Sequence, residues 1–351
     1  TTVQTSGNVD IHVQGMASKA FKCGGDMQVS QGNIYLVTSG DAFYDTDAAD
    51  ISSPAGIKCD GNVTISNGNI TIESSGAGGK GMNADGKIVI GGGEIKVTTT
   101  GGQFKYRNDD TAAKAIKCDG DMTIDGGTIV IKTSGQEAEG LESKANMIIN
   151  NGTLDIQAYD DCMNASKSIT INGGSIYCYS TTNDGIDSNG TLTITGGTIV
   201  SVGSASPEEG FDCDRNTFKI TGGTLIGIGG ATSTPTSNVC TQYSLVYSGS
   251  GISQNSYLNV TAADGINILT YLIPRSLTGI TILFSSTGLQ KNTGYTISSG
   301  GSVSGGASFY GLYSGATYTG GSQLSSFTVS SIVTTIGSSG GGFPGGGGRP
   351  R

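Results

Sequence analysis

Apolar residues recur in one pattern along the first two-thirds of the chain, on both sides of a glycine turn. The clearest copy is Ile194-Thr-Gly-Gly-Thr-Ile199, in which β-branched residues flank a glycine pair. Comparable copies end at Ile34, Ile70, Ile95, Ile129, Leu154, Ile176 and Leu225. The alternation of apolar and polar residues beside each turn predicts short β-strands, and no window has an apolar 3.6-residue period long enough for a helix.

The spacing of the turns indicates the architecture. The glycines that mark successive copies are Gly7, Gly32, Gly68, Gly93, Gly127, Gly152, Gly174, Gly197 and Gly223. Most steps are 22 to 26 residues and two are longer, at 36 and 34. A unit of this length with two or three short strands is typical of one coil of a parallel β-helix. We therefore predict an all-β fold, a right-handed parallel β-helix of about nine coils over residues 1–230.

The pattern changes after residue 230. Residues 1–230 have a net charge of −12, whereas residues 231–351 have +3. Short strands are predicted at 256–260, 267–271, 279–284 and 326–330, which indicates an antiparallel β domain or cap over 231–338. The glycine-rich stretch 339–351 is expected to be a tail or linker. A chain with a net negative charge is a poor candidate for nucleic-acid binding, and no apolar run is long enough to insert into a membrane.

Seven cysteines are present, so at least one is unpaired. Four of them occupy one place in the repeat, namely Cys23, Cys59, Cys118 and Cys213. Small residues occupy the same place in other copies, namely Ala84, Ser143, Ala165 and Ser188. This favours an inward-facing column of small side chains. Disulfides or metal-binding thiols are the lesser alternative because no Cys-x-x-Cys pair exists.

Charged residues repeat at two places in the segment that precedes each turn. One column directly follows the segment's central apolar residue, and it should point outward because strand side chains alternate. It consists of Lys22, Lys58, Asn83, Lys117, Glu142, Asn164, Asp187 and Asp212. The other column lies two residues before the apolar one and consists of Lys19, Ala55, Lys80, Lys114, Glu139, Asp161, Asp184 and Glu209. Both columns change from lysine to carboxylate near residue 135, which predicts one face with a basic half and an acidic half.

The acidic half contains ten carboxylates in a few coils. They are Glu139, Glu142, Asp160, Asp161, Asp184, Asp187, Glu208, Glu209, Asp212 and Asp214. Coils are expected about 4.8 Å apart, where two carboxylates repel by roughly 3 kcal/mol at an effective dielectric of about 20. Either these side chains splay into water, or a hard cation lies among them. Oxygen ligands without histidine favour Ca²⁺ over Zn²⁺, so this column is a candidate calcium site.

The two long steps each add about ten residues at the same turn. The first insertion contains Asp41, Asp45, Asp47 and Asp50 with Phe43 and Tyr44; the second contains Asp109 and Asp110 with Phe104, Lys105, Tyr106 and Arg107. They lie beside Lys58 and Lys117 and beside a third column, Asp60, Asp85 and Asp119. Long loops on a rigid scaffold often bind ligands. We expect the aspartates to contribute further calcium ligands, and the aromatic and basic residues to contact an acidic sugar chain; the alternative is a pair of surface loops without function.

The chain resembles a bacterial family of secreted carbohydrate-binding β-helix proteins. The resemblance depends on the segments Ala-Gly-Ile-Lys-Cys-Asp-Gly (55–61) and Ala-Ile-Lys-Cys-Asp-Gly (115–120), and on C-terminal segments at 283–286, 295–301, 311–315 and 331–337. It implies a fold similar to that of pectate lyases, bound Ca²⁺, a secreted or cell-surface location, and binding rather than cleavage of plant cell-wall cellulose and polygalacturonate. It assigns no individual ligand residue.

Two other functions fit the same residues. In a polysaccharide lyase, Ca²⁺ would bind the sugar carboxylate and Lys58 or Lys117 would remove the C5 proton of a uronate. In a passive cell-surface β-solenoid, the repeats would have only a structural role. For a binding protein, we expect Lys22, Lys58, Lys80, Lys114 and Lys117 to form a basic face that pairs with the polysaccharide.

Overall fold

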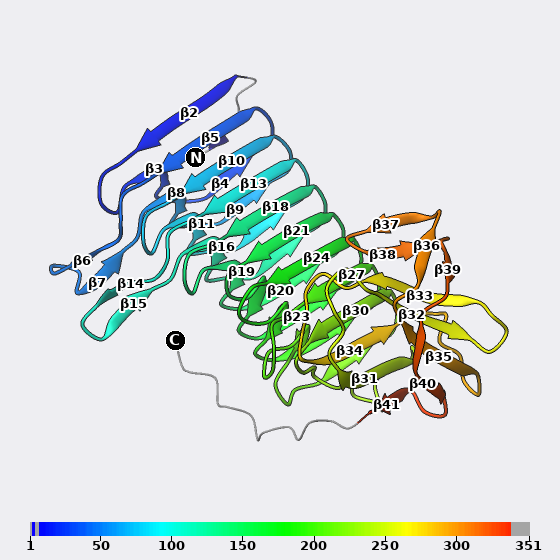
Figure 1. The fold of residues 1–351 in the computed structure, drawn as a ribbon. Coiled ribbons are helices and arrows are strands. Elements are labelled where there is room, and N and C mark those ends of the chain that lie inside the picture. Colours follow the sequence, from blue (N-terminus) through cyan, green and yellow to red (C-terminus); the bar gives the residue numbers. More distant parts are fainter. Residues whose placement is uncertain (1, 4–6, 338–351) are drawn as a thin grey trace.

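The computed structural model describes residues 2–3 and 7–337. Every regular element in these residues is a β-strand, and they contain no helix. Three long sheets, here called A, B and C, run along the molecule and contain the repeats (Figure 1). In most repeats the chain passes through sheet C, then sheet A, then sheet B.

The strands of each sheet are short. Sheet A contains β1 (Thr2–Val3), β4 (Met27–Val29), β9 (Val63–Ile65), β12 (Ile88–Ile90), β17 (Met122–Ile124), β20 (Asn146–Ile149), β23 (Ser168–Ile171), β26 (Thr191–Ile194) and β29 (Phe218–Ile220). Sheet B begins with β2 (Asn8–Val13), β5 (Asn33–Thr38), β10 (Asn69–Ser74), β13 (Glu94–Thr99), β18 (Thr128–Thr133), β21 (Thr153–Ala158), β24 (Ser175–Ser180), β27 (Thr198–Val202) and β30 (Thr224–Gly229). Sheet C contains β3 (Lys19–Cys23), β8 (Ala55–Cys59), β11 (Lys80–Ala84), β16 (Lys114–Cys118), β19 (Glu139–Ser143), β22 (Met163–Ala165), β25 (Ile186–Ser188) and β28 (Phe211–Asp212).

Each of these strands pairs in parallel with its counterparts in the neighbouring repeats. On sheet B, for example, Ile70 lies opposite Ile34 on one side and Ile95 on the other. Identical positions of the repeat are therefore stacked. The predicted all-β class is confirmed, and the stacked parallel sheets are compatible with a β-helix.

The repeat sequence explains both the core and the turns. Seven isoleucines that the pattern places inside are at most 1% exposed: Ile65, Ile70, Ile72, Ile124, Ile129, Ile194 and Ile199. At eight of the repeat glycines, from Gly32 to Gly223, φ lies between 89° and 118°. Glycine adopts this left-handed region without steric cost, which is why one recurs at each turn.

The column of small residues faces the core as predicted. Cys23, Cys59, Cys118 and Cys213 are at most 2% exposed, and Ala84 and Ser143 occupy the same column. All seven cysteines of the chain are buried thiols. Their role in the repeat is therefore packing.

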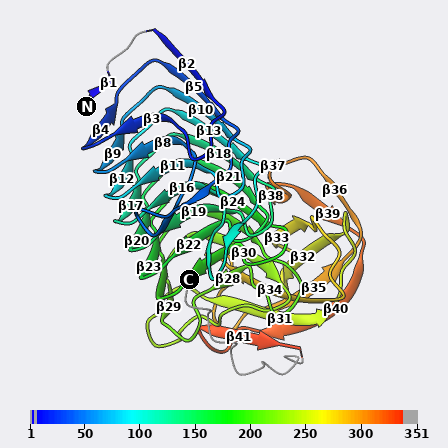
Figure 2. The same ribbon diagram turned by 90° about the vertical axis from the view of Figure 1, so that its left-hand side faces the viewer.

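The C-terminal strands extend sheet B and then form a separate sheet beside it (Figure 2). The strands are β31 (Ser244–Ser250), β32 (Tyr257–Ala262), β33 (Asn267–Leu272), β34 (Gly279–Ser285), β35 (Gly294–Ser299), β36 (Ser302–Ser304), β37 (Ala307–Phe309), β38 (Leu312–Ser314), β39 (Thr317–Thr319), β40 (Ser322–Thr328) and β41 (Val333–Ile336). β34 pairs antiparallel with both β30 and β31, whereas β41 pairs parallel with β31. The other strands form antiparallel pairs in a six-stranded sheet and in a two-stranded sheet of β36 and β39. Three of the four strands predicted here match β32, β33 and β34, and the fourth overlaps only the end of β40.

Each insertion forms a β-hairpin rather than an irregular loop. The first contains β6 (Phe43–Asp45) and β7 (Asp50–Ser52), and the second contains β14 (Phe104–Tyr106) and β15 (Asp109–Thr111). The glycine-rich tail predicted at 339–351 lies outside the described residues. Within them, the chain offers no helix with the length and apolarity that crossing a membrane requires.

Candidate functional site

The charged columns predicted from the sequence lie on sheet C and are stacked in register. Lys117 lies opposite Glu142, and Asp187 lies opposite Asp212. In the first of these columns, which directly follows the central apolar residue of each segment, the side chains differ in exposure. Lys22 is exposed, whereas Glu142 is buried. The predicted stacking is confirmed, but the column is not a uniformly solvated face.

Most of the second column is buried, which contradicts the prediction of a basic face that includes Lys80 and Lys114. The two residues are only 4% and 6% exposed. Positions two apart on a strand share a face, so Lys80 lies on the same side as the core residue Met82. Lys80 Nζ donates hydrogen bonds to Thr111 Oγ1 (2.9 Å) and to the Ala112 carbonyl. Lys80 therefore holds the end of the second hairpin to sheet C, and neither buried lysine is available to a polysaccharide.

A buried network of ion pairs marks the point where the column changes sign. Lys114 Nζ pairs with Glu139 Oε1 and lies 3.8 Å from Glu142 Oε1, which also pairs with Lys144 Nζ at 2.5 Å. Burial disfavours the charged form of Lys114, but the two glutamates raise its pKa overall. Burial likewise opposes ionisation of Glu142, but Lys114 and Lys144 lower its pKa to about 2. Both glutamates are thus engaged by lysines.

The lysines of the outward column also have carboxylate partners. Lys58 Nζ pairs with Asp85 and lies 3.5 Å from Asp60 Oδ1, and Lys117 Nζ lies 3.5 Å from Asp119 Oδ1. The side chains of Lys58 and Lys117 are 16% and 23% exposed. The aspartates of the third column, Asp60, Asp85 and Asp119, therefore largely neutralise the lysines of the predicted basic half.

Beyond these ion pairs the carboxylates have little compensating charge. Residues 139–215 contain 11 acidic and three basic side chains. Asp160, Asp161 and Asp184 are 6%, 4% and 8% exposed. For these three residues, burial contradicts the alternative in which the carboxylates splay into water.

Hydrogen bonds link the buried carboxylates from coil to coil. Asp161 Oδ1 accepts a hydrogen bond from the backbone N–H of Asp184 (3.1 Å), and Asp184 Oδ1 accepts one from that of Glu209. Asn164 Nδ2 donates to both Asp161 Oδ2 (3.1 Å) and Asp187 Oδ2 (3.2 Å). These bonds give hydrogen-bond donors to some of the carboxylate oxygens, but they add no positive charge.

The pKa values of these carboxyl groups are raised, because they are buried beside one another with little positive charge nearby. Burial and then Asp187 raise the pKa of Asp161 well above its ordinary range, and burial and Asp212 do the same for Asp184. Burial, with Asp212 next, raises the pKa values of Asp187 and Glu209 to about 8 each. Among the described residues, the buried Glu209 Oε2 also has no hydrogen-bond partner. A positive charge beside this column would relieve the repulsion.

The predicted calcium ligands form one column but do not surround one point. In the part of the chain that the structure describes, no group of three or more His, Cys, Asp or Glu side chains is arranged to hold a metal ion. Backbone carbonyls, amide oxygens and waters are ordinary additional ligands of Ca²⁺. A calcium site on this column would therefore need some of them.

The two hairpins lie side by side and bring together predicted ligand-binding residues from separate insertions (Figure 1). The rings of Tyr44 and Tyr106 stack with centroids 4.3 Å apart and an angle of 15°. The guanidinium carbon of Arg107 lies 5.2 Å from the centroid of the Tyr106 ring. Phe104 lies on the same hairpin and is half-buried. The result is an aromatic pair with a cation at its side, in which each tyrosine covers one face of the other.

The aspartates of the insertions mostly stabilise the hairpins. Asp45 Oδ1 accepts hydrogen bonds from the backbone N–H groups of Asp47 (3.0 Å) and Ala48, and Asp110 Oδ2 accepts one from Gln103 (2.9 Å). Two others, Asp50 and Asp109, are exposed on the hairpins. In the order of sheet C, β16 beside the second hairpin is separated from β25 by β19 and β22. The structure therefore does not bring these aspartates together with Asp187 on β25.

The sequence analysis missed a polar row on sheet B. Asn8, Asn33 and Asn69 lie opposite one another on β2, β5 and β10 and form a hydrogen-bonded row of side-chain amides. The signal was present, because each asparagine directly follows a repeat glycine. No other copy of the repeat has asparagine at this place, so the row is confined to the N-terminal end.

The chain was also compared with known proteins. The model of a family described as carbohydrate-binding domain-containing protein matches overlapping stretches at residues 3–102, 76–138, 101–185 and 134–300. Together these stretches extend over residues 3–300, which include all three columns, both hairpins and the asparagine row. No curated protein and no solved structure matches the chain.

Proposed function

The chain belongs to the family of carbohydrate-binding domain-containing proteins, and from that premise we propose that it binds acidic plant cell-wall polysaccharide without cleaving it. Polygalacturonate is the proposed main ligand, cellulose a second one, and Ca²⁺ the cofactor. The proposal includes a secreted or cell-surface location on a bacterium. It also includes the finer fold: sheets A, B and C close into a right-handed β-helix of about nine coils, similar to that of pectate lyases.

The observation that supports calcium dependence is the buried and half-buried carboxylate column of sheet C, which has little compensating positive charge. Asp161, Asp187 and Asp212, with the side-chain oxygen of Asn164, would hold the ion, because carboxylate and amide oxygens suit Ca²⁺. When bound, Ca²⁺ supplies positive charge that the carboxylates of a polyuronate can share. The carboxylates near Lys58, Lys114 and Lys117 are left out of this proposed site because those ammonium groups already neutralise them.

Other contacts to the polysaccharide come from exposed cations and from the aromatic pair. Lys22 and Arg107 are exposed and can pair with sugar carboxylates, and Tyr44 offers a ring face to a sugar. Exposed ion pairs contribute only about 0.2–1 kcal/mol each. Binding should therefore require several contacts along one chain, weaken for short oligomers and decrease with salt.

Affinity electrophoresis in gels that contain polygalacturonate tests this proposal. We expect the protein to be retarded in Ca²⁺, and to migrate freely in EGTA or at high salt. The double variant Asp187→Asn/Asp212→Asn should lose the calcium-dependent retardation. The control variant Asp264→Asn, which changes an exposed aspartate outside the repeats, should keep it. Equal retardation of the wild-type protein in Ca²⁺ and EGTA would overturn the calcium dependence.

The same preparations distinguish the other two functions. A lyase that uses Lys58 or Lys117 as its base would release unsaturated product, which absorbs in the ultraviolet, when Ca²⁺ and polygalacturonate are both present. A passive solenoid would show no retardation under any condition. We expect retardation without any increase in that absorbance.

A further inference from the structure

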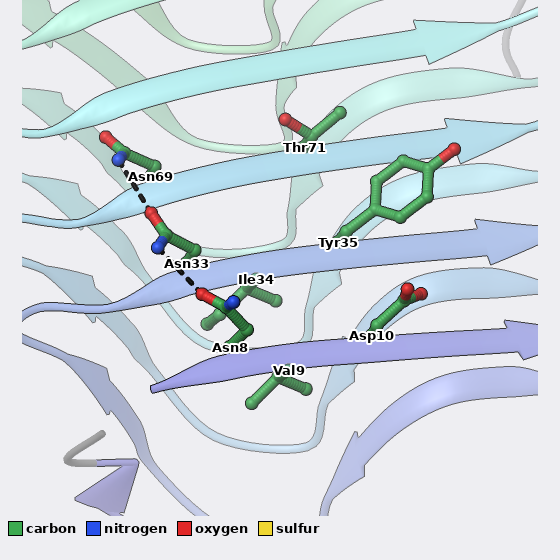
Figure 3. A pocket seen from close by; sticks show the side chains of 8 residues that line it. All are labelled: Asn8, Val9, Asp10, Asn33, Ile34, Tyr35, Asn69 and Thr71. Carbon is green, nitrogen blue, oxygen red and sulfur yellow. Dashed lines mark hydrogen bonds between the residues drawn. The ribbon is translucent and has the colours of Figure 1, made fainter. Parts of the chain in front are cut away.

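An open groove lies on the outer face of sheet B at its N-terminal end, away from the carboxylate column of sheet C. It has a volume of about 370 Å³ and extends over β2, β5 and β10 (Figure 3). This volume falls within the roughly 300–1,000 Å³ of ordinary ligand sites. The groove runs between two rows of outward side chains, which are about 7 Å apart along the strands.

One row is the chain of asparagine amides. Asn69 Nδ2 donates to Asn33 Oδ1 (2.8 Å), and Asn33 Nδ2 donates to Asn8 Oδ1 (2.9 Å). All three side chains are exposed. Each amide has two N–H donors and an oxygen with two lone pairs, so every member of the row keeps hydrogen-bonding capacity toward the groove. Hydroxyl groups, which both donate and accept, complement such a row.

The other row contains Tyr35, with Asp10 and Thr71 directly opposite it on the neighbouring strands. The ring of His12 contacts the Tyr35 ring edge-on, with centroids 5.4 Å apart and an angle of 75°. Burial and the neighbouring Glu73 carboxylate raise the pKa of the Tyr35 hydroxyl, so it remains a donor at neutral pH. The half-buried ring forms a wall of the groove, opposite the amides (Figure 3).

The charge of the groove selects against an acidic ligand. Its eight lining residues include Asp10 but neither lysine nor arginine, and Glu73 lies at its border. A uronate would be repelled there, whereas carboxylates are good acceptors for neutral sugar hydroxyls. Two further tyrosines of this outer face are already covered, because Tyr177 stacks on Tyr310 and Tyr179 lies under Arg275. Tyr35, in contrast, faces the open groove.

We propose that this groove is a second carbohydrate-binding site, which takes the uncharged pyranose units of a neutral oligosaccharide between the Tyr35 ring and the row Asn8, Asn33 and Asn69. The site rests on the function proposed above and deepens it, because it gives the proposed cellulose binding a place that involves neither Ca²⁺ nor the carboxylates of sheet C. Sugar binding there is independent of calcium and nearly independent of salt.

Saturation-transfer NMR with cellohexaose as the probe tests this site in the full-length protein in EGTA. Wild-type protein should transfer saturation to the sugar ring protons. Tyr35→Ala should weaken binding by roughly tenfold, as expected when an aromatic contact is lost. Tyr35→Phe, which keeps the ring, should bind nearly as well as the wild type, and Asn33→Ala, which interrupts the amide row, should bind several-fold more weakly.

Two controls separate this result from the polygalacturonate site. Tyr44→Ala should leave cellohexaose binding in EGTA unchanged, and Tyr35→Ala should keep its calcium-dependent retardation by polygalacturonate, which also shows that it is folded. If Tyr35→Ala fails to fold, the cellohexaose binding of Asn33→Ala alone tests the proposed site. Undiminished cellohexaose binding by the folded variants, or no binding by the wild type in EGTA, would overturn the proposal whatever happens with polygalacturonate.

Discussion

Single glycines on sheet C show how closely the coils are stacked. A Cβ atom at Gly81 would lie 2.3 Å from Val97 Cγ1 and 2.4 Å from the backbone oxygen of Ala115. Gly25, in contrast, has no atom within 4 Å of such a Cβ. We therefore expect Gly81→Ala to lower the free energy of unfolding by about 1–3 kcal/mol, as overpacked cores do. Urea unfolding should detect this, and Gly25→Ala should change it little; equal effects of both would contradict the stacking described here.

Lys80 gives the stability a specific pH dependence. Burial and the neighbouring Lys114 lower its pKa to about 7, with Lys117 acting in the same direction and Glu139 and Glu142 opposing. Between pH 7 and about 10.5 the unfolded chain binds this proton and the folded chain does not. The Lys80 contribution to the free energy of unfolding therefore increases with pH across that window, by at most about 1.4 kcal/mol per pH unit.

The variant Lys80→Met isolates this contribution, because the other groups titrate in both proteins. Its stability relative to the wild type should be greatest near pH 6 and should decrease toward pH 9. Urea unfolding of both proteins at pH 6, 7.5 and 9 measures the difference. If the free energies of unfolding of the two proteins changed in parallel with pH, burial would not destabilise the ammonium form of Lys80.

For individual residues, the sequence predicted which positions stack from coil to coil better than it predicted which side chains face the core. The repeat placed Ile65, Cys59 and Asp187 in their correct columns, because stacked coils repeat the same position. It misplaced Lys80 and Lys114, since a lysine at a buried place contradicts the ordinary preference of charged residues for water. Only the structure shows that Thr111, the Ala112 carbonyl and Glu139 satisfy these two ammonium groups.

Among the elements, the two hairpins depend on each other through one aromatic contact. Tyr44 and Tyr106 stack across the gap between β6 and β14. Removing either ring should loosen both hairpins and remove the proposed sugar-stacking surface, while the sheets keep their core. We expect Tyr106→Ala to weaken polygalacturonate binding several-fold and to change the melting temperature little.

A control for that variant is Tyr313→Ala on β38, which removes a ring from the C-terminal sheet instead. It should leave the retardation by polygalacturonate unchanged. If Tyr106→Ala binds as tightly as the wild type, the hairpins are surface features without a role in binding.

The elements themselves were largely predictable, whereas their partners were not. Periodicity located the strands of the repeat because each copy has the same alternation and turn glycine. The insertions were recognised by length alone, and their pairing into adjacent hairpins depends on contacts between residues about 60 positions apart, such as Tyr44 and Tyr106. The local pattern also contains no sign that β41 joins sheet B beside β31, parallel to it.

Over the whole molecule, the C-terminal strands are integrated with the repeats. β34 continues sheet B from β30, and apolar residues of both parts share a core that includes Val200, Ile228 and Tyr271. Arg275 donates hydrogen bonds to the carbonyl oxygens of Ser180 (2.6 Å) and Thr181 (2.9 Å) on the repeat side. The strands that extend sheet B thus leave no open edge on β30, and a ligand bound to the repeats should stabilise the entire unit.

Thermal unfolding therefore tests the calcium proposal independently of any sugar. A ligand that binds only the folded state stabilises it by about 2.7 kcal/mol at a concentration of 100 times its dissociation constant. For a chain of 351 residues that corresponds to a rise in melting temperature of roughly 3–4 °C. We expect EGTA to lower the melting temperature by such an amount and added Ca²⁺ to restore it.

The variant Asp187→Asn/Asp212→Asn should differ from the wild type both in its melting temperature in EGTA and in its response to Ca²⁺. Neutral amides remove the repulsion that raises the pKa values of Asp187 and Glu209, so the variant should melt higher than the wild type in EGTA. It should also respond little to Ca²⁺, because two of its proposed ligands have lost their charge. Differential scanning calorimetry of both proteins, with and without Ca²⁺, measures all four values. A wild-type melting temperature indifferent to Ca²⁺ and EGTA would leave the buried carboxylates as protonated core residues, with no ion among them.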